Sequence, residues 1–164
     1  MMRITIDTNV LICGIDGSLE EQKVFDDLMS LKQRELLDIA ITSRFDQDKK
    51  KDSDLERVKK HYQIARMLTA IPSSFRCGIS LLGQDRLVDE VVYKPLSKLF
   101  KVEDSEKANH NTLMDVDHLY GHWVDNREYF LTYENRILRK KEALVKLNIK
   151  VDNPSNFLIS NNLW

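Results

Sequence analysis

The stretch Arg3-Ile4-Thr5-Ile6-Asp7-Thr8-Asn9-Val10-Leu11 sets the pattern of the chain, because an alternating apolar run ends in an acid, a hydroxyl and an amide. Ile4 and Ile6 are two residues apart and therefore share one face of an extended segment. Asp7-Thr8-Asn9 follows where a strand gives way to a loop or helix, and open α/β sheets build their sites there. Two interpretations fit: an acid presented to a metal or substrate, or a turn whose polar residues cap a helix.

Length and composition predict one folded domain over residues 1–164. Of the 164 residues, 42% are hydrophobic and 31% are charged, which is typical of a globular protein with its own core. The formal net charge is −1, so a polyanion would have to be held by a local basic patch. The candidate patches are Lys49-Lys50-Lys51 and the group Arg136, Arg139, Lys140 and Lys141. An ordinary solvated surface is the alternative for each.

Cysteine usage and hydropathy indicate a cytoplasmic protein. Cys13 and Cys77 have no CxxC spacing and are interpreted as free thiols in a reducing compartment. The N-terminal Met-Met-Arg leads into a strand without the apolar segment that is typical of a signal peptide. No apolar run approaches the ~20 residues that a membrane-spanning helix needs, so we expect no membrane association.

Short apolar runs alternate with amphipathic helices along the chain. Two capping boxes, Ser18 with Glu21 and Ser53 with Glu56, each predict the start of a helix. Strands are predicted at 4–6, 39–42, 129–132 and 147–151, with a further one within 75–82. This order predicts an α/β fold, namely a three-layer α/β/α sandwich with a central, mainly parallel sheet.

Acidic residues follow the predicted strands or lie near the start of the helices after them. They are Asp7, Asp46, Asp48, Asp115 and Glu134. Because the carboxyl ends of parallel strands meet at one edge of a sheet, we expect these side chains to face one crevice. Carboxylates gathered without matching cations repel one another, and a bound divalent cation is the usual stable solution.

Asp115 lies on a predicted helix that also carries two histidines. Helical phase places Asp115, His118 and His122 on one face, whereas Asp117 points about 200° away from Asp115. Asp115 follows Thr112 by three residues, so a capping-box acid near the helix N-terminus is the alternative to a metal ligand. The His118 and His122 spacing suits zinc, but the sequence has no His-Glu-x-x-His and no third-ligand pattern. A structural role is favoured, with His118 hydrogen-bonded to a carboxylate.

Three blocks of the sequence resemble the PIN domain family of small metal-dependent ribonucleases. Ile6-Asp7-Thr8-Asn9-Val10-Leu11 is similar to the family's opening strand and first acid. Asp115-Val116-Asp117-His118-Leu119 resembles an acid-bearing helix, and Phe130-Leu131-Thr132-Tyr133-Glu134 resembles a strand followed by Thr, a spacer and an acid. The tail, 147–158, resembles the last strand with its Pro and closing turn. These blocks bracket nearly the whole chain, whereas the middle, 48–111, has no match.

The resemblance implies cleavage of RNA phosphodiester bonds with Mg²⁺ or Mn²⁺. It implies catalytic roles for Asp7, Asp48, Asp115 and Glu134, and metal-binding roles for Asp7, Asp46, Asp115 and Asp117. It implies substrate contacts from Asn9, Arg44, Thr132 and Arg136. Two positions depart from the family pattern. Glu134 stands where Asp is usual, and Asp46 or Asp48 stands where the second acid is usually Glu.

The partners that the resemblance implies are RNA, an antitoxin or other protein, and a second copy of the chain in a homodimer. The main alternative function is a PIN-like domain that has lost catalysis and binds RNA or protein, and the two departures support it. A receiver-like phosphotransfer domain is disfavoured, because the sequence lacks its Lys near the last strand and its phosphorylatable Asp at the third strand.

Overall fold

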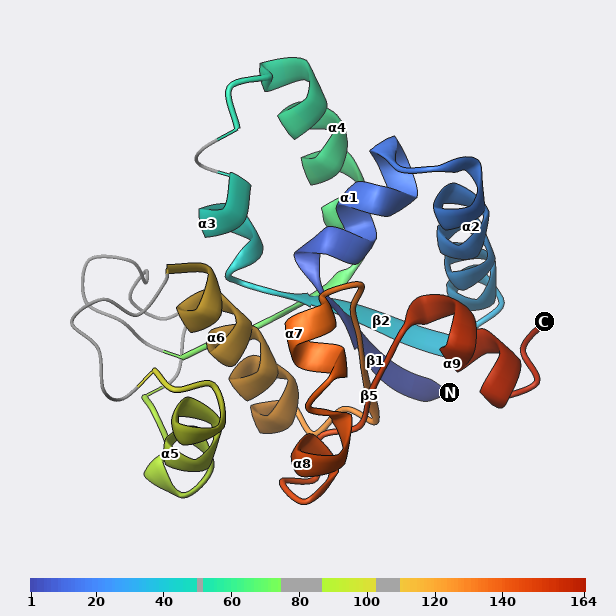
Figure 1. The fold of residues 1–164 in the computed structure, drawn as a ribbon. Helices are drawn as coiled ribbons and strands as arrows, with labels where there is room; N and C mark the ends of the chain where they lie inside the picture. The colour runs from blue at the N-terminus through green and yellow to red at the C-terminus, as the bar shows by residue number, and fades with distance from the viewer. Residues whose placement is uncertain (50–51, 75–86, 103–109) are drawn as a thin grey trace.

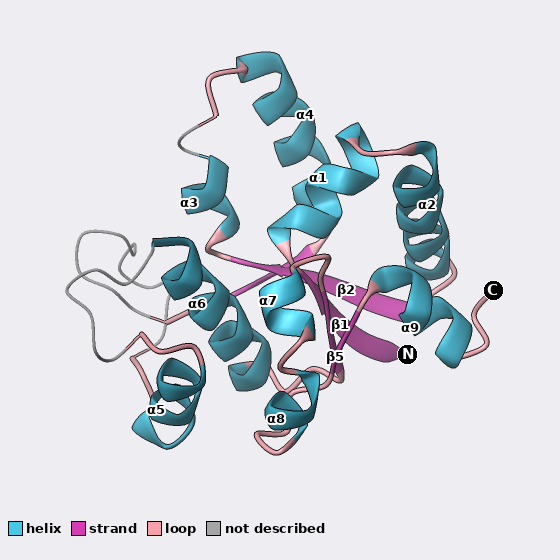
Figure 2. Cartoon of the chain, in the orientation of Figure 1, coloured by secondary structure: helices cyan, strands magenta, loops and turns pink. Residues whose placement is uncertain are grey.

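The computed structural model describes residues 1–49, 52–74, 87–102 and 110–164. Strands and helices alternate along these residues (Figure 2). The strands are β1 (Met2–Ile6), β2 (Leu37–Thr42), β3 (Thr69–Ile71), β4 (Tyr129–Leu131) and β5 (Val151–Asp152). The helices are α1 (Thr8–Asp16), α2 (Leu19–Gln33), α3 (Phe45–Lys49), α4 (Leu55–Ala65), α5 (Glu90–Leu99), α6 (His110–Val124), α7 (Asn135–Leu138), α8 (Lys141–Val145) and α9 (Pro154–Ser160).

The strands form one parallel sheet in the order β3-β2-β1-β4-β5. β1 is central, and Ile4 pairs with Ile39 of β2 on one side and with Tyr129 of β4 on the other. The chain winds outward from β1 to β3 and then crosses back to β4 and β5. The carboxyl ends of β1 and β4 therefore form the topological switch point, where open α/β sheets form their crevices.

Helices cover both faces of the sheet, so the fold is a three-layer α/β/α sandwich, as the sequence predicts (Figure 1). On one face, Ile4, Ile6 and Leu131 pack with apolar residues of α1, α2 and α9. On the other face, Phe130 packs with residues of α5, α6, α7 and α8. Because side chains alternate along a strand, neighbouring residues of β4 reach opposite layers.

One predicted helix start needs correction and one alternative is excluded, whereas the capping box that starts α2 forms as predicted. α4 is capped by Asp54, which accepts a hydrogen bond from the Arg57 amide, and not by Ser53. α6 begins at His110, so Asp115 lies in its second turn and is not the acid of a capping box. A helix-capping role therefore does not explain the position of Asp115.

The outer strands differ most from the sequence prediction. The pattern does not predict β3, because its three residues, two of them exposed, carry no alternation signal. β5 covers only Val151–Asp152, so it starts later and is shorter than the strand predicted at 147–151. The strand predicted within 75–82 lies outside the described residues.

Gly121 allows α6 to pack against the chain that follows β3. A Cβ atom at this position would lie 2.6 Å from the carbonyl oxygen of Pro72, which is closer than real contacts allow. A side chain here would therefore push α6 away from the sheet, and with it every site residue that α6 carries. Among the described helices, none has both the length and the apolar character that spanning a membrane requires.

Candidate active site

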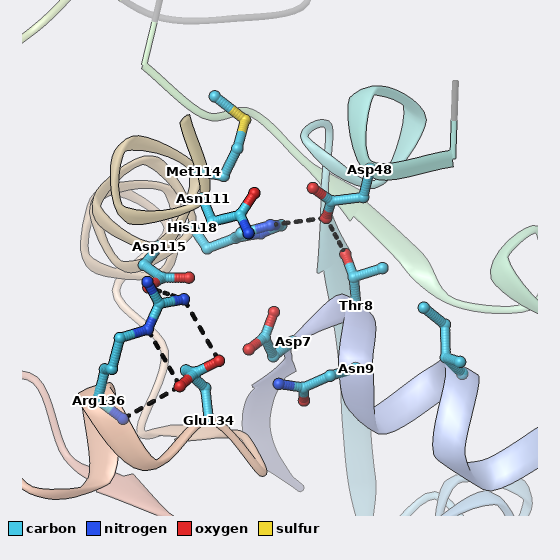
Figure 3. Close-up of a pocket in the computed structure, with 11 residues that line it drawn as sticks. Asp7, Thr8, Asn9, Asp48, Asn111, Met114, Asp115, His118, Glu134 and Arg136 are labelled. Atoms are coloured by element: carbon cyan, nitrogen blue, oxygen red, sulfur yellow. Dashed lines mark hydrogen bonds and ion pairs between the residues drawn. The ribbon is translucent and has the colours of Figure 1, made fainter. Parts of the chain in front are cut away.

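A pocket of about 240 Å³ lies at the switch point, beside the carboxyl ends of β1 and β4. Four of the predicted acids line it, each from a different segment (Figure 3). Asp7 follows β1, Asp48 lies on α3, Asp115 lies on α6 and Glu134 caps α7. The structure thus brings together side chains that are up to 127 positions apart in the sequence, which is the separation of Asp7 and Glu134.

Asp7 is buried and held by the loop that follows β4. Its Oδ2 accepts a hydrogen bond from Thr132 Oγ1 at 2.6 Å. Thr132 Oγ1 in turn accepts hydrogen bonds from Asn9 Nδ2 at 3.2 Å and from the Glu134 amide at 2.9 Å. Burial raises the pKa of Asp7, and the charge of His118 and the Thr132 hydrogen bond only partly oppose it. The carboxylate is therefore oriented by its neighbours yet poorly solvated.

Thr132 has a different role from the predicted one, whereas the substrate contact predicted for Asn9 stays a prediction. Thr132 is fully buried and donates its hydroxyl hydrogen to Asp7, so the predicted substrate contact from Thr132 is wrong. Asn9 lines the pocket, but its amide links Thr132 to the Tyr133 amide, whose N–H reaches Asn9 Oδ1 at 3.2 Å. Both residues position Asp7 and the loop before α7.

Asp115 is, like Asp7, an acid whose ionised form is poorly stabilised. Burial and then the charge of Asp7 raise its pKa from 3.8 to about 7, against the opposing charges of Arg136 and His118. Arg136 Nη2 lies 3.2 Å from Asp115 Oδ2, but this buried oxygen accepts no hydrogen bond from the described residues. An oxygen in this condition suits a ligand that binds without hydrogen bonds, and a divalent cation is such a ligand.

Asp48 is paired with His118. Its Oδ2 accepts from Thr8 Oγ1 at 2.6 Å and lies 3.1 Å from His118 Nε2. Burial lowers the pKa of His118, but the hydrogen bond and charge of Asp48 outweigh it and raise this pKa to about 9. Burial raises the pKa of Asp48, yet His118 and Thr8 bring it below its ordinary value. At neutral pH the two form an ion pair, in agreement with the predicted hydrogen bond from His118 to a carboxylate.

Glu134 is paired with Arg136, two residues later. Glu134 Oε1 accepts from Arg136 Nε at 3.1 Å and from the Arg136 amide at 3.2 Å, and so caps α7. The hydrogen bond from Arg136 holds the pKa of Glu134 below its ordinary value. Arg136 therefore lines the pocket with its contacts directed to acids of the site, and its predicted substrate contact stays a prediction.

Arg44 and Asp117 lie outside the pocket, so their predicted roles are wrong. Arg44 Nε is 3.0 Å from Asp117 Oδ2, and the two side chains are 1% and 0% exposed. A substrate phosphate cannot reach this guanidinium, nor can a metal in the pocket reach this carboxylate. Ser74 Oγ donates to Asp117 Oδ1 at 2.6 Å, and the Ser74 carbonyl accepts from Arg44 Nη2. The pair joins α6 to the ends of β2 and β3.

Asp46 and Lys49 are also placed away from the predicted contacts. Asp46 is exposed on α3 and hydrogen-bonds the Tyr62 hydroxyl, so it is Asp48 that lines the pocket. The predicted metal-binding role of Asp46 is therefore wrong for this geometry. Lys49 is buried, with its Nζ 3.7 Å from Asp52 Oδ2, and offers no phosphate contact. The rest of that run, 50–51, lies outside the described residues.

His118 and His122 face different surroundings despite their shared helix. His122 is fully buried, and its Nδ1 is 2.9 Å from Oγ1 of Thr5, a residue of β1. His118 points into the pocket toward Asp48 (Figure 3). Burial, and then the charge of Arg127, lower the pKa of His122 to about 3, which keeps its ring neutral. The two rings share no site, in keeping with the structural role that the sequence favours.

Two residues that line the pocket, Asn111 and Met114, are missed by the sequence reasoning. Both lie on α6, where residues 111, 114, 115 and 118 recur at helical spacing and form one face. That spacing is visible in the sequence and could have found them. The site is predicted from acidic, histidine and basic side chains, and neither the amide of Asn111 nor the thioether of Met114 belongs to these types.

The donor set fits a hard divalent cation by its chemistry. Four carboxylates provide oxygen ligands, and Asp115 Oδ2 is buried without a hydrogen-bond donor among the described residues. Their spacing is not that of an assembled site, since within the described ranges no three His, Cys, Asp or Glu side chains are gathered closely enough to hold a metal. Arg136 and His118 hold three of the four acids in their present positions.

The fold and the pocket define a three-layer α/β protein with an acidic crevice at the switch point of a parallel sheet. No protein-family model matches the chain, and no curated protein matches it. The resemblance to PIN domains therefore stays a prediction from the three sequence blocks.

Proposed function

We propose that this protein is a divalent-metal-dependent endoribonuclease that cleaves RNA phosphodiester bonds. The observation that carries the proposal is the pairing of Asp7 and Asp115 in one pocket. They come from the end of β1 and from α6, burial raises the pKa of both, and the charge of Asp7 raises that of Asp115 further. A cation between them would relieve this repulsion, which gives the pocket a physical reason to bind one.

Asp7 and Asp115 would hold Mg²⁺ or Mn²⁺ directly, with Glu134 and Asp48 completing the acidic ring. The bound ion would acidify a water molecule and offset charge on the phosphoryl oxygens. Thr132 and Asn9 keep the Asp7 carboxylate oriented toward the pocket. His118 holds Asp48 beside it.

RNA is the proposed substrate because a partly exposed arginine, Arg136, lines the acidic pocket and further basic residues follow it in the sequence. Arg136 lies on α7 with its side chain 42% exposed, and Arg139 is exposed at the end of the same helix. Lys140 and Lys141 contribute less, since they bind the Leu99 carbonyl and Asp152. A guanidinium group is suited to hold a phosphate, and that of Arg136 lines the pocket itself. An antitoxin or other protein partner and a homodimer stay predictions from the resemblance.

A non-catalytic module that binds RNA or protein is the second candidate, and one observation favours it. Arg136 bridges Asp115 and Glu134, and His118 pairs with Asp48, so internal cations already neutralise part of the acidic ring. Binding of RNA without cleavage or metal dependence would select this candidate.

Cleavage of a long single-stranded RNA tests the proposal. We expect wild type to cleave with Mg²⁺ or Mn²⁺ and to lose this activity with a chelator. Asp7→Asn and Asp115→Asn should each reduce the cleavage rate at least about a hundredfold, because each removes a charged ligand that stabilises the transition state. Asp46→Asn, an exposed acid on the same helix as Asp48, is the matched control and should remain within about threefold of wild type. Equal cleavage by wild type and both site variants would refute the site assignment.

A further inference from the structure

The Arg136 guanidinium occupies the part of the pocket between Asp115 and Glu134 (Figure 3). Nε is 3.1 Å from Glu134 Oε1, and Nη2 is 3.4 Å from Glu134 Oε2. Nη2 is also 3.2 Å from Asp115 Oδ2, and Nη1 donates to Thr112 Oγ1 at 3.2 Å. One planar cation therefore contacts two of the four acids. A metal ion in the pocket would need both of these carboxylates as ligands.

This ion pair is suited to exchange. The Arg136 side chain is 42% exposed, and its approach to Asp115 Oδ2 provides charge without a hydrogen bond. The Arg44–Asp117 pair in the same protein is at most 1% exposed. A guanidinium at the rim can leave for solvent with a small loss of free energy, because water solvates it there and screens the pair. The buried Arg44 guanidinium cannot move into solvent in this way.

We propose that Arg136 is an internal cation that competes with the divalent metal for Asp115 and Glu134, and that the metal binds as this guanidinium leaves. The inference rests on the proposed function, since it concerns the same metal site. It also accounts for the spacing of the acids. The Arg136 guanidinium lies between the carboxylates of Asp115 and Glu134 and keeps them apart. This separation is wider than the coordination shell of a small ion.

The released guanidinium is then free to bind a phosphate of the RNA. Arginine pairs with phosphate through two parallel hydrogen bonds, and these take the place of its ion pairs with the acids. Any phosphate that draws Arg136 away from Asp115 raises the affinity of the pocket for metal, and by linkage the metal raises the affinity for that phosphate. Metal and RNA loading are thereby coupled through one side chain.

Calorimetric titration of the metal-free protein with MnCl₂ alone tests the competition. We expect Arg136→Gln to bind Mn²⁺ about tenfold more tightly than wild type, because the competing cation is removed. Arg136→Lys keeps the charge but loses the planar fork, and it should bind more tightly than wild type and less tightly than Arg136→Gln. Arg139→Gln removes the same charge from the end of the same helix, and it should stay within about twofold of wild type.

Each outcome has a distinct meaning. Equal or weaker Mn²⁺ binding by Arg136→Gln, with clear binding by wild type, overturns the competition and leaves the metal site of the proposed function intact. An equal gain in Arg136→Gln and Arg139→Gln also overturns it, because net charge alone would then explain the effect. No Mn²⁺ binding by any of the four proteins overturns both proposals. Thermal unfolding with and without MnCl₂ checks that all four proteins are folded, and the rise in Tm should be largest for Arg136→Gln.

Discussion

Replacement of Arg44 by methionine is expected to lower the free energy of unfolding by about 3–5 kcal/mol, because it removes the guanidinium that pairs with the buried Asp117 carboxylate. Both side chains are at most 1% exposed, and Arg44 Nε lies 3.0 Å from Asp117 Oδ2. Water cannot replace the missing partner at this depth. Ser74 Oγ and Tyr93 OH, at 2.6 and 3.2 Å from Asp117 Oδ1, provide hydrogen bonds without balancing the charge. Urea denaturation followed by circular dichroism measures the loss.

A double substitution separates charge from packing in this prediction. Arg44→Met with Asp117→Asn removes both charges and keeps an amide oxygen for Ser74 and Tyr93, so it should recover a large part of the lost stability. Arg57→Met is the matched control, because Arg57 pairs with Asp52 at 2.6 Å but is 48% exposed, and its loss should change stability little. Equal effects of Arg44→Met and Arg57→Met would contradict the structural role of the buried pair.

Replacement of Asp115 by asparagine is expected to stabilise the metal-free protein by about 2–4 kcal/mol above pH 7. The folded protein has an Asp115 pKa of about 7, against an ordinary value of 3.8. Because the folded pKa is raised, the unfolded chain releases this proton first, and the stability of wild type falls as pH rises from about 4 to about 7. Asparagine resembles the protonated acid at every pH and removes this loss.

The pH dependence of the difference is the sharper test. Urea denaturation with a chelator present should show no difference between wild type and Asp115→Asn near pH 3, a growing advantage of the variant up to about pH 7, and a constant advantage above it. Asp26→Asn, an exposed acid on α2, should show no such advantage. A variant that is less stable than wild type at pH 8 would mean that the ion pair with Arg136 stabilises ionised Asp115 by more than burial destabilises it. Such a result would remove the main physical argument for a cation between Asp7 and Asp115.

The fold class is predictable from local patterns. Ile4 and Ile6 alternate into a buried strand, Ser18 and Glu21 form the capping box that starts α2, and apolar runs alternate with amphipathic helices. β3 is not predictable in this way, because three residues are too few to show a period and because β3 is held by backbone pairing with β2.

The candidate site is predictable in outline, because the carboxyl ends of parallel strands meet at one edge. Asp7, Asp48, Asp115 and Glu134 do line one pocket. The choice between Asp46 and Asp48 is not open to sequence reasoning, since it depends on which side of the short helix α3 faces α6. The burial of Arg44 and Asp117 is equally hidden, because a charged residue is buried only when a specific partner meets it.

The sequence by itself determined which residues form most of the strands and helices and which acids follow the strands, because these properties depend on side-chain period and on neighbours within a few positions. The tertiary structure alone decided how each charge is balanced. Arg44 binds Asp117 in the core, whereas Arg136 stays at the rim between Asp115 and Glu134. The physical reason is that the free energy of a charge depends on its burial and on partners far away in the chain, and neither exists until the layers have packed.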